Sequence, residues 1–268
     1  MMKRIISGIA IFAIVLAVFF FANQYVVDVF VALITARSIF ELYKALEVKG
    51  HNPIKTIGLI SSLAICFLHV IPKEFSIYYI GMVMVLSIFL LFLISIIKHK
   101  KVNVVDISLT FFGVCYVVIF SMFVALLRGR DNGKFLVWYI FIGAWITDTF
   151  AYFVGKNFGK HHFTKVSPNK TIEGSIGGTI LSVVFAVIFT LIINSNFNLN
   201  INYYIITLIA FVLSIIGQIG DLAASCIKRY TGVKDYSNLI PGHGGMLDRI
   251  DSVIFIAPFA YFLITLLV

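Results

Sequence analysis

The chain has 268 residues, of which 60% are hydrophobic and 12% are charged. A soluble domain has roughly 25% charged and 45–50% apolar residues, so this composition excludes an ordinary soluble protein and also a disordered chain. Three cysteines are too few for a secreted disulfide scaffold. The sequence therefore predicts an all-α, polytopic integral membrane protein with little mass outside the bilayer.

A membrane-spanning helix needs about 20 mostly apolar residues, and nine segments of the chain approach this requirement. In chain order they are 5–22, 25–43, 56–71, 76–97, 104–127, 135–154, 175–194, 202–225 and 251–268. The third is short, and the second contains Asp28, Arg37 and Glu41, of which the last two have the i, i+4 spacing of an ion pair. We interpret the chain as one membrane domain, in which residues 1–134 form N-terminal helices and residues 135–268 carry the polar motifs.

The basic residues are distributed unevenly between the two sides of these predicted spans. Sixteen of the 21 lysines and arginines lie in alternate segments that begin with the N-terminus, and four lie in the segments between them. Because cytoplasmic loops carry the excess of basic residues, the N-terminus and the loops 155–174 and 226–250 are predicted to face the cytoplasm across the cell (inner) membrane. The net charge of +9 is spread over short loops, which indicates membrane topology and an anionic substrate, with no nucleic acid partner. Residues 3–22 lack a small-residue cleavage site, so we interpret them as a helix and not as a signal peptide.

Six of the twelve acidic residues lie between residues 148 and 251, alongside the two most basic of the predicted cytoplasmic loops. A carboxylate within or at the edge of a membrane span is energetically unfavourable, so each of the six is a candidate functional residue. They are Asp148, Glu173, Asp221, Asp235, Asp248 and Asp251.

The segment 217–252 has the densest pattern of polar residues in the chain. A helix that continues to about residue 229 places four polar side chains on one face, by i, i+4 and i+7 or i+8 spacing. These are Asp221, Ser225, Lys228 and Arg229. One carboxylate and two cations would then point the same way at the cytoplasmic interface.

The glycine-rich stretch Pro241-Gly242-His243-Gly244-Gly245 follows this helix. It breaks the chain and permits a close approach of the backbone to a ligand. His243 could contact a phosphate or a metal, or it could have only a structural role in the turn. Asp248 and Asp251 come next, at i, i+3 spacing on one face of the first turn of the last helix. The free N–H groups of that turn suit carboxylates, phosphates or both.

Carboxylates beside lysines and arginines indicate a site for a divalent cation and a polyphosphate. Mg2+ prefers one or two carboxylates plus substrate phosphates over a closed protein cage. Neighbouring cations neutralise the phosphates, and phosphoryl-type transfer depends mostly on positioning and charge stabilisation. The pattern is therefore compatible with a Mg2+ site, whereas a purely structural role of the carboxylates as helix caps or surface groups is the alternative.

The loop 148–178 supplies further polar residues. Ser167-Pro168-Asn169-Lys170 is a predicted turn that carries one cation, and Thr171 is the expected cap of the following helix. His161 and His162 lie in a basic loop, and we expect no metal site there unless a carboxylate is close by. Five glycines allow two interpretations, because they could admit a phosphate or let two helices pack closely. They are Gly155, Gly159, Gly174, Gly177 and Gly178.

Three runs of residues between 225 and 251 form one longer pattern. They read Ser225-x-Ile227-Lys228-Arg229, Lys234-Asp235-x-Ser237 and Ile240-Pro241-x-His243-Gly244-Gly245-Met246-x-Asp248-Arg249-Ile250-Asp251. Over these 27 positions the chain resembles, without a departure, the signature of the phosphatidate cytidylyltransferases, also called CDP-diacylglycerol synthases. A second stretch is similar to the same family and reads Asp148, Ala151-Tyr152, Gly155, Gly159-Lys160 and Ser167-Pro168-Asn169-Lys170-Thr171-x-Glu173-Gly174. The resemblance covers about the C-terminal half of the chain, whereas the N-terminal half agrees only in length and hydrophobicity.

The resemblance implies a reaction of phospholipid biosynthesis, in which CTP and phosphatidate give CDP-diacylglycerol and diphosphate with Mg2+ as the cofactor. A phosphatidate oxygen would attack the α-phosphorus of CTP directly, which agrees with the lack of an obvious nucleophile–base pair in the sequence. The expected partners are CTP, phosphatidate and the lipid bilayer. A homodimer is compatible with the family, although the sequence locates no interface.

The candidate site residues fall into three sets under this interpretation. The expected metal ligands are Asp221 and Asp248, with Asp251 and Asp148 as further ligands or orienting groups. The residues expected to act in catalysis are Asp221, Lys228, Arg229, Asp248 and Asp251. The expected substrate-binding residues are Asp148, Lys170, Glu173, Ser225, Lys234, His243, Gly244, Gly245 and Arg249, and phosphate contacts are expected from Lys170, Lys228, Arg229 and Lys234.

Three other functions are alternatives to that of a phosphatidate cytidylyltransferase. A cytidylyltransferase that acts on an isoprenoid-ether lipid phosphate would carry the same motifs and stays open. A polytopic transporter would place polar residues near the bilayer midplane in repeated halves, but the chain shows no internal repeat. CDP-alcohol phosphotransferases have an Asp-Gly-x-x-Ala-Arg motif, whereas this chain reads Asp-Leu-Ala-Ala-Ser at 221–225. The sequence assigns no role to residues 128–131, which fall on the predicted outer side.

Overall fold

The computed structural model describes residues 2–99, 101–162, 164, 166–240, 242 and 244–268, with side chains from residue 7 onward. Every regular element in these residues is a helix, and their β contacts are isolated bridges. The prediction of an all-α protein is therefore confirmed. The chain forms two compact units, of which the first consists of Met1–Asp131 with Lys228–Ile250 and the second of Asn132–Ile227 with Asp251–Val268.

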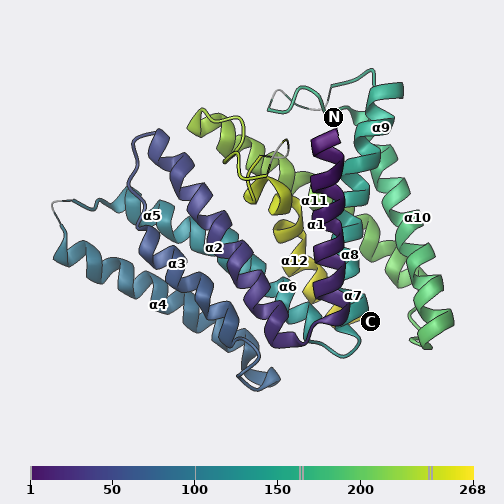
Figure 1. Ribbon diagram of the computed structural model, residues 1–268, viewed down its shortest axis with the longest axis horizontal. Helices are drawn as coiled ribbons and strands as arrows, with labels where there is room; N and C mark the ends of the chain where they lie inside the picture. Colours follow the sequence, from purple (N-terminus) through teal and green to yellow (C-terminus); the bar gives the residue numbers. More distant parts are fainter. Residues whose placement is uncertain (1, 100, 163, 165, 241, 243) are drawn as a thin grey trace. The chain divides into compact units, whose positions relative to one another are not determined.

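The first unit contains the helices of the N-terminal half (Figure 1). They are α1 (Met2–Phe21), α2 (Gln24–Val48), α3 (Lys55–Leu63), α4 (Ser76–Ile97), α5 (Val104–Gly113) and α6 (Phe120–Arg128), with 3₁₀ turns at Ala64–Phe67 and Lys73–Phe75. A π-helical stretch at Val114–Ile119 joins α5 to α6 in one continuous rod. Local sequence explains where α2 begins, because the side chain of Asn23 accepts the first-turn N–H of Val26 at 3.0 Å.

The second unit contains four further helices and most of the last two helices. α7 (Gly133–Leu136), α8 (Trp138–Phe141), a π-helical stretch (Ile142–Ile146) and α9 (Thr147–Phe158) follow one another as a single rod, and α10 (Ile172–Phe197), α11 (Tyr203–Thr231) and α12 (Leu247–Leu267) complete the chain. The boundary between the units crosses α11 after Ile227 and α12 after Ile250. The segment Lys228–Ile250 therefore packs with the N-terminal helices.

Among the residues that the structure describes, six stretches are long and apolar enough to cross a bilayer. They are Lys73–Ile97, Val104–Arg128, Gly133–Phe158, Ile172–Phe197, Tyr203–Thr231 and Leu247–Leu267. On α4 large apolar side chains face outward, for example Phe89, which is 61% exposed. A soluble protein does not expose such a surface, whereas lipid covers it without penalty, so the protein is a multi-pass membrane protein. Of the other predicted spans, α3 has nine residues and α2 carries five charged residues, so the count of nine stays a prediction.

Closely spaced glycines let α9 and α10 pack against each other in the second unit (Figure 1). A Cβ atom on Gly178 would lie 2.6 Å from the carbonyl oxygen of Thr147, and a Cβ on Gly174 would lie 2.5 Å from that of Ala151. Both distances are shorter than any normal contact, so only glycine permits this approach. Of the two interpretations of these glycines, the structure supports close helix packing.

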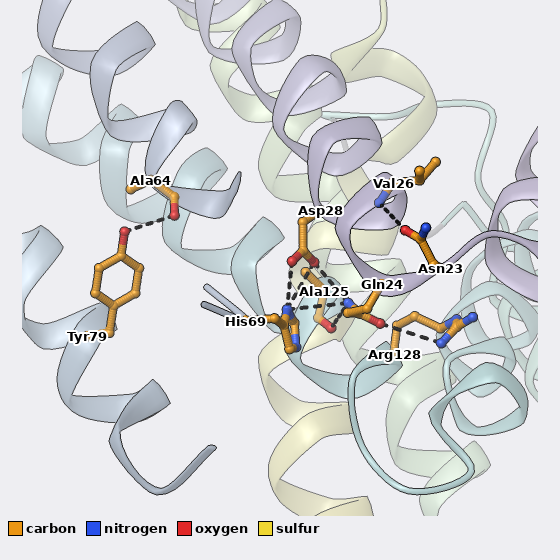
Figure 2. A network of polar contacts seen from close by, with 9 residues as sticks. All are labelled: Asn23, Gln24, Val26, Asp28, Ala64, His69, Tyr79, Ala125 and Arg128. Carbon is orange, nitrogen blue, oxygen red and sulfur yellow. Dashed lines mark hydrogen bonds and ion pairs between the residues drawn. The ribbon is translucent and has the colours of Figure 1, made fainter. Parts of the chain in front are cut away.

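A polar cluster lies between α2 and α6 in the first unit, where Gln24 contacts both Asp28 and Arg128 (Figure 2). The carboxylate of Asp28 is fully buried and lies 2.8 Å from His69 Nδ1. Arg128 donates from Nε to the carbonyl oxygen of Phe19 at 2.7 Å and from Nη2 to that of Ala22 at 3.1 Å. These carbonyls end α1 and have no partner within the helix, so Arg128 caps α1. The sequence alone assigned Arg128 no role.

Candidate active site

Asp248 lies in the first turn of α12, and its side chain is 2% exposed. Its Oδ1 contacts Lys228 Nζ at 2.8 Å, and its Oδ2 accepts the backbone N–H groups of Tyr236 at 2.9 Å and Gly245 at 3.0 Å. These two N–H groups lie at opposite ends of the segment 236–245. The carboxylate therefore closes that segment into a loop at the start of α12.

Lys228 lies in the last turn of α11, which continues to Thr231. The expectation that this helix extends to about residue 229 is confirmed. The side chain of Lys228 is 15% exposed, and its ammonium group lies 5.4 Å above the ring of Tyr236. Lys228 and Asp248 are thus a nearly buried ion pair that includes an aromatic neighbour.

Glu41 of α2 reaches the same loop and is 1% exposed. Its Oε1 accepts hydrogen bonds from Arg37 Nε at 3.1 Å and from the hydroxyl of Ser237 at 2.6 Å. Its Oε2 accepts the backbone N–H of Leu247 at 2.9 Å, at the first residue of α12. The predicted pair of Arg37 and Glu41 is confirmed, but sequence reasoning missed both contacts with the loop. The available signal was a carboxylate inside a predicted membrane span, which is energetically unfavourable without partners.

The backbone geometry of the loop requires glycine at several of its positions. Gly242 and Gly244 have φ angles of +79° and +82°, which only glycine adopts without strain. A Cβ on Gly245 would lie 2.5 Å from Glu41 Oε2, so any other residue would displace this carboxylate. Gly244 and Gly245 thus shape the loop, whether or not they also approach a substrate. His243 lies outside the described residues.

Lys170 and Asp221 form an ion pair within the second unit. Asp221 lies on α11, and Lys170 ends the predicted turn, which is closed by a hydrogen bond from the Lys170 N–H to the Ser167 carbonyl at 3.1 Å. Their side chains are 29% and 26% exposed, so this pair is more accessible than that of Lys228 and Asp248. The expected cap is also confirmed, because Thr171 Oγ1 accepts the N–H of Gly174 at 3.1 Å.

His161 lies against a carboxylate that the sequence did not place near it. His161 Nδ1 is 2.6 Å from Glu173 Oε1, and the N–H of His161 donates to Glu173 Oε2 at 3.3 Å. The N–H of Ile172 donates to the His161 carbonyl at 2.9 Å. Glu173 therefore holds the loop before α10 against the start of that helix.

A chain of hydrogen-bonded side chains runs between α9, α10 and α11 in the second unit. Thr147 donates to Ser214 at 2.9 Å, Ser214 donates to Thr179 at 3.0 Å, and Gln218 Nε2 donates to the same Thr179 oxygen at 3.0 Å. Ser175 donates to Gln218. Sequence reasoning missed this chain, which ends at Gln218, one turn before Asp221 on α11.

The other candidate residues occupy varied environments. Asp251 is buried, and its Oδ1 accepts the Ser252 N–H at 2.8 Å. Ser225 is half-buried on α11. The exposed candidates are Asp148, Arg229, Lys234 and Arg249.

The described residues contain no group of three or more acidic, histidine or cysteine side chains that could hold a metal on its own. Asp221 and Asp248 each contact a lysine ammonium group. Neither aspartate therefore belongs to a closed metal cage among the described residues of its own unit. A carboxylate of this kind, beside a lysine, has the chemistry of a Mg2+ ligand that is completed by substrate phosphates.

Comparison with known proteins shows where the chain belongs. Residues 2–267 match the cytidylyltransferase family, so the chain is a member of that family. The match includes the N-terminal helices, which the signature does not cover.

The chain is also similar to individual curated proteins. It is 32% identical to the phosphatidate cytidylyltransferase of Bacillus subtilis over 248 residues, which cover 88% of this chain and 89% of that protein. It is 36% identical to the phosphatidate cytidylyltransferase of Staphylococcus haemolyticus over 171 residues, which cover 63% of this chain and 64% of that protein. A Staphylococcus aureus protein of the same name is 36% identical over 165 residues, 61% of each chain.

Proposed function

We propose that this protein is a phosphatidate cytidylyltransferase, which transfers the cytidylyl group of CTP to phosphatidate and releases diphosphate. The family and the names of the similar proteins support this reaction. One structural observation supports roles for particular residues. The two aspartates expected to bind metal, Asp221 and Asp248, each contact a lysine expected to bind phosphate.

In the proposed reaction a phosphate oxygen of phosphatidate attacks the α-phosphorus of CTP. A new P–O bond forms, the bond from the α-phosphorus to the oxygen that bridges to the β-phosphorus breaks, and its electron pair leaves with diphosphate. No covalent enzyme intermediate is needed, so the side chains act by positioning the phosphates and neutralising their charge. Contacts to phosphate are proposed for Lys170, Lys228, Arg229 and Lys234.

Asp221 and Asp248 are proposed to hold Mg2+, with Asp251 and Asp148 as further ligands or orienting groups. The bound ion would neutralise phosphate oxygens and stabilise the leaving diphosphate. Because each aspartate already contacts a lysine, substrate binding is proposed to exchange these partners. Lys170 and Lys228 would turn to the phosphates, and the carboxylates would become available to the cation that accompanies the nucleotide.

The orientation of the protein is part of the proposal. We propose nine spans from the apolar segments of the sequence. The excess of basic residues supports an N-terminus in the cytoplasm and places the loops 155–174 and 226–250 on the cytoplasmic side of the cell membrane in this proposal. CTP is a cytosolic nucleotide, and phosphatidate of the inner leaflet presents its headgroup to the same side. A homodimer stays a prediction from the family resemblance.

The test is the transfer of radiolabel from the α-phosphate of CTP into organic-extractable lipid. Purified protein with phosphatidate micelles and Mg2+ is expected to label the lipid, and Asp248→Asn and Asp221→Asn are expected to remove turnover while the protein stays folded. Glu47→Gln is the matched control, because Glu47 pairs with Lys55 in an exposed contact on α2. Substantial residual turnover in either aspartate variant would remove that residue from the metal site.

The lipid acceptor is decided by a second arm of the same assay. Phosphatidate and an isoprenoid-ether lipid phosphate are offered separately to the wild-type protein. Label only in the ether lipid would replace the proposed substrate but keep the nucleotidyl transfer. Folded protein that labels neither lipid would contradict the proposed reaction.

A further inference from the structure

Glu41 links a helix of the N-terminal half to the loop between α11 and α12, here called the signature loop (residues 232–246). Its three hydrogen-bond donors come from three places in the first unit. Arg37 is on its own helix, Ser237 is inside the signature loop, and Leu247 begins α12. The separations in sequence between Glu41 and the last two are 196 and 206 residues. The contacts therefore belong to the tertiary structure and to no local motif.

Glu41 and Asp248 both hold the signature loop at two places. Within the loop, the N–H of Tyr236 donates to Asp248 and the hydroxyl of the next residue, Ser237, donates to Glu41. Where the loop meets α12, the N–H of Gly245 donates to Asp248 and the N–H of Leu247 donates to Glu41. Two carboxylates, one from α2 and one from α12, thus hold the same loop in place. We therefore expect that a displacement of one carboxylate also shifts the loop residues that donate hydrogen bonds to the other.

The position of Asp248 depends directly on the contact between Glu41 and Leu247. The Leu247 N–H is the first of α12, and such first-turn N–H groups have no partner within their helix. Glu41 supplies that partner and so sets where α12 begins, one residue before Asp248. The side chain of Asp248 has little freedom of its own, because both of its oxygens already have partners.

We propose that Glu41 is a positioning residue for Asp248 and the signature loop in the reaction. In this role Glu41 touches no reacting atom. It acts by holding Asp248 and the backbone of the signature loop in the position in which they contact the substrate. The inference rests on the proposed function in one respect, that Asp248 binds the metal. Residues that orient a metal ligand typically change metal affinity or activity by about 10–100-fold when they are substituted.

Glu41→Gln is the sharpest variant, because it keeps the shape of the side chain. A carboxylate offers acceptors to Arg37 and Ser237 on one oxygen and to Leu247 on the other. An amide has one acceptor and one donor, so its NH₂ group must face either the Leu247 N–H or the Arg37 N–H. The NH₂ group of the glutamine and the N–H group that it faces are then two donors without an acceptor between them, at a buried position. Glu47→Gln, on the same helix, is the matched control.

The experiment combines a structural and a functional measurement on the full-length protein in detergent. Hydrogen–deuterium exchange of the peptide that covers residues 235–247 reports on the loop, and the Mg2+ concentration for half-maximal label transfer reports on Asp248. For Glu41→Gln we expect faster exchange in 235–247 than in the wild type. We also expect turnover about 10–100-fold lower and half-saturation at a higher Mg2+ concentration. For Glu47→Gln we expect both measurements to match the wild type.

The inference is overturned if Glu41→Gln leaves loop exchange at the level of Glu47→Gln. It is also overturned if the loop exchanges faster while turnover and Mg2+ dependence stay normal, since Glu41 would then have only a structural role. Should Glu41→Gln fail to fold, Ser237→Ala removes one of the two loop contacts and leaves the buried charge in place. Normal exchange and normal turnover in Ser237→Ala would then count against the inference.

Failure of the proposed function gives a different pattern. If Asp248→Asn keeps turnover, Asp248 is not the metal ligand, and the proposed role of Asp248 fails whatever Glu41 does. If Asp248→Asn removes turnover but Glu41→Gln does not, the role of Asp248 stands and the positioning role of Glu41 fails.

Discussion

Lys228 Nζ lies 2.8 Å from Asp248 Oδ1 and so joins the last turn of α11 to the first turn of α12. Each charge sits at the helix end that favours it, because a helix carries a partial negative charge at its C-terminus and a partial positive charge at its N-terminus. The pair therefore has a structural basis as well as a proposed function. The two contributions can be separated by substituting the residues singly and together.

Lys228→Met should destabilise the protein and remove turnover. It leaves the Asp248 carboxylate, 2% exposed, without its cation, and breaking a buried pair from one side costs about 3 kcal/mol or more. Thermal unfolding in detergent measures the loss. The double variant Lys228→Met with Asp248→Asn should recover most of this stability, because no buried charge is left unpaired, yet stay inactive. A double variant as unstable as the single one would show that the pair does not explain the loss.

Lys170→Met should weaken the use of CTP with little effect on stability. The pair of Lys170 and Asp221 is partly exposed, and such pairs contribute at most about 1 kcal/mol. A lost charged contact to phosphate corresponds to about a tenfold higher apparent KM for CTP. Lys156→Met, in an exposed position on α9, is the control. An unchanged KM for CTP in Lys170→Met would count against a phosphate contact.

Gly178→Ala should destabilise the packing of α9 against α10. The new methyl group would lie 2.6 Å from the Thr147 carbonyl oxygen, and overpacking of this kind costs about 1–3 kcal/mol. Gly81→Ala is the matched control on α4, where a Cβ atom would meet nothing within 4 Å. The melting temperatures of the two variants should differ. Equal melting temperatures of Gly178→Ala and Gly81→Ala would mean that α9 and α10 accommodate the added methyl group without loss of stability.

Arg128→Met should lower stability and leave the KM for CTP unchanged. It removes the donors to the Phe19 and Ala22 carbonyls at the end of α1, and unpaired buried polar groups cost about 1–3 kcal/mol. Lys73→Met is the control, since Lys73 pairs with Asp131 and both side chains are exposed. A change in the KM for CTP would show that Arg128 also affects the site.

Local features of the structure were predictable from the sequence. Thr171 caps α10, Arg37 pairs with Glu41, and α11 continues past residue 229, as their spacing and residue types predict. These features depend on neighbours within about one helical turn. The geometry of the helix, which the sequence reveals through its apolar pattern, therefore suffices to place them.

Contacts between distant segments were not predictable in the same way. Glu41 was assigned to Arg37 alone, and its partners Ser237 and Leu247 lie far away in the sequence. The sequence did not indicate a carboxylate beside His161, yet the backbone turns so that Glu173 lies against it. No spacing rule relates such residues, because their distance depends on how whole helices and loops pack.

The sequence by itself determined the class of protein and the chemistry of its motifs. Hydrophobicity over about 20 residues decides whether a helix can enter a bilayer, and this property needs no knowledge of the fold. Only the tertiary structure decided that Asp248 pairs with Lys228, that Asp221 pairs with Lys170 and that Glu41 caps α12. An ion pair or hydrogen bond requires two atoms about 3 Å apart. Packing alone brings residues separated by 20 to 206 positions to that distance.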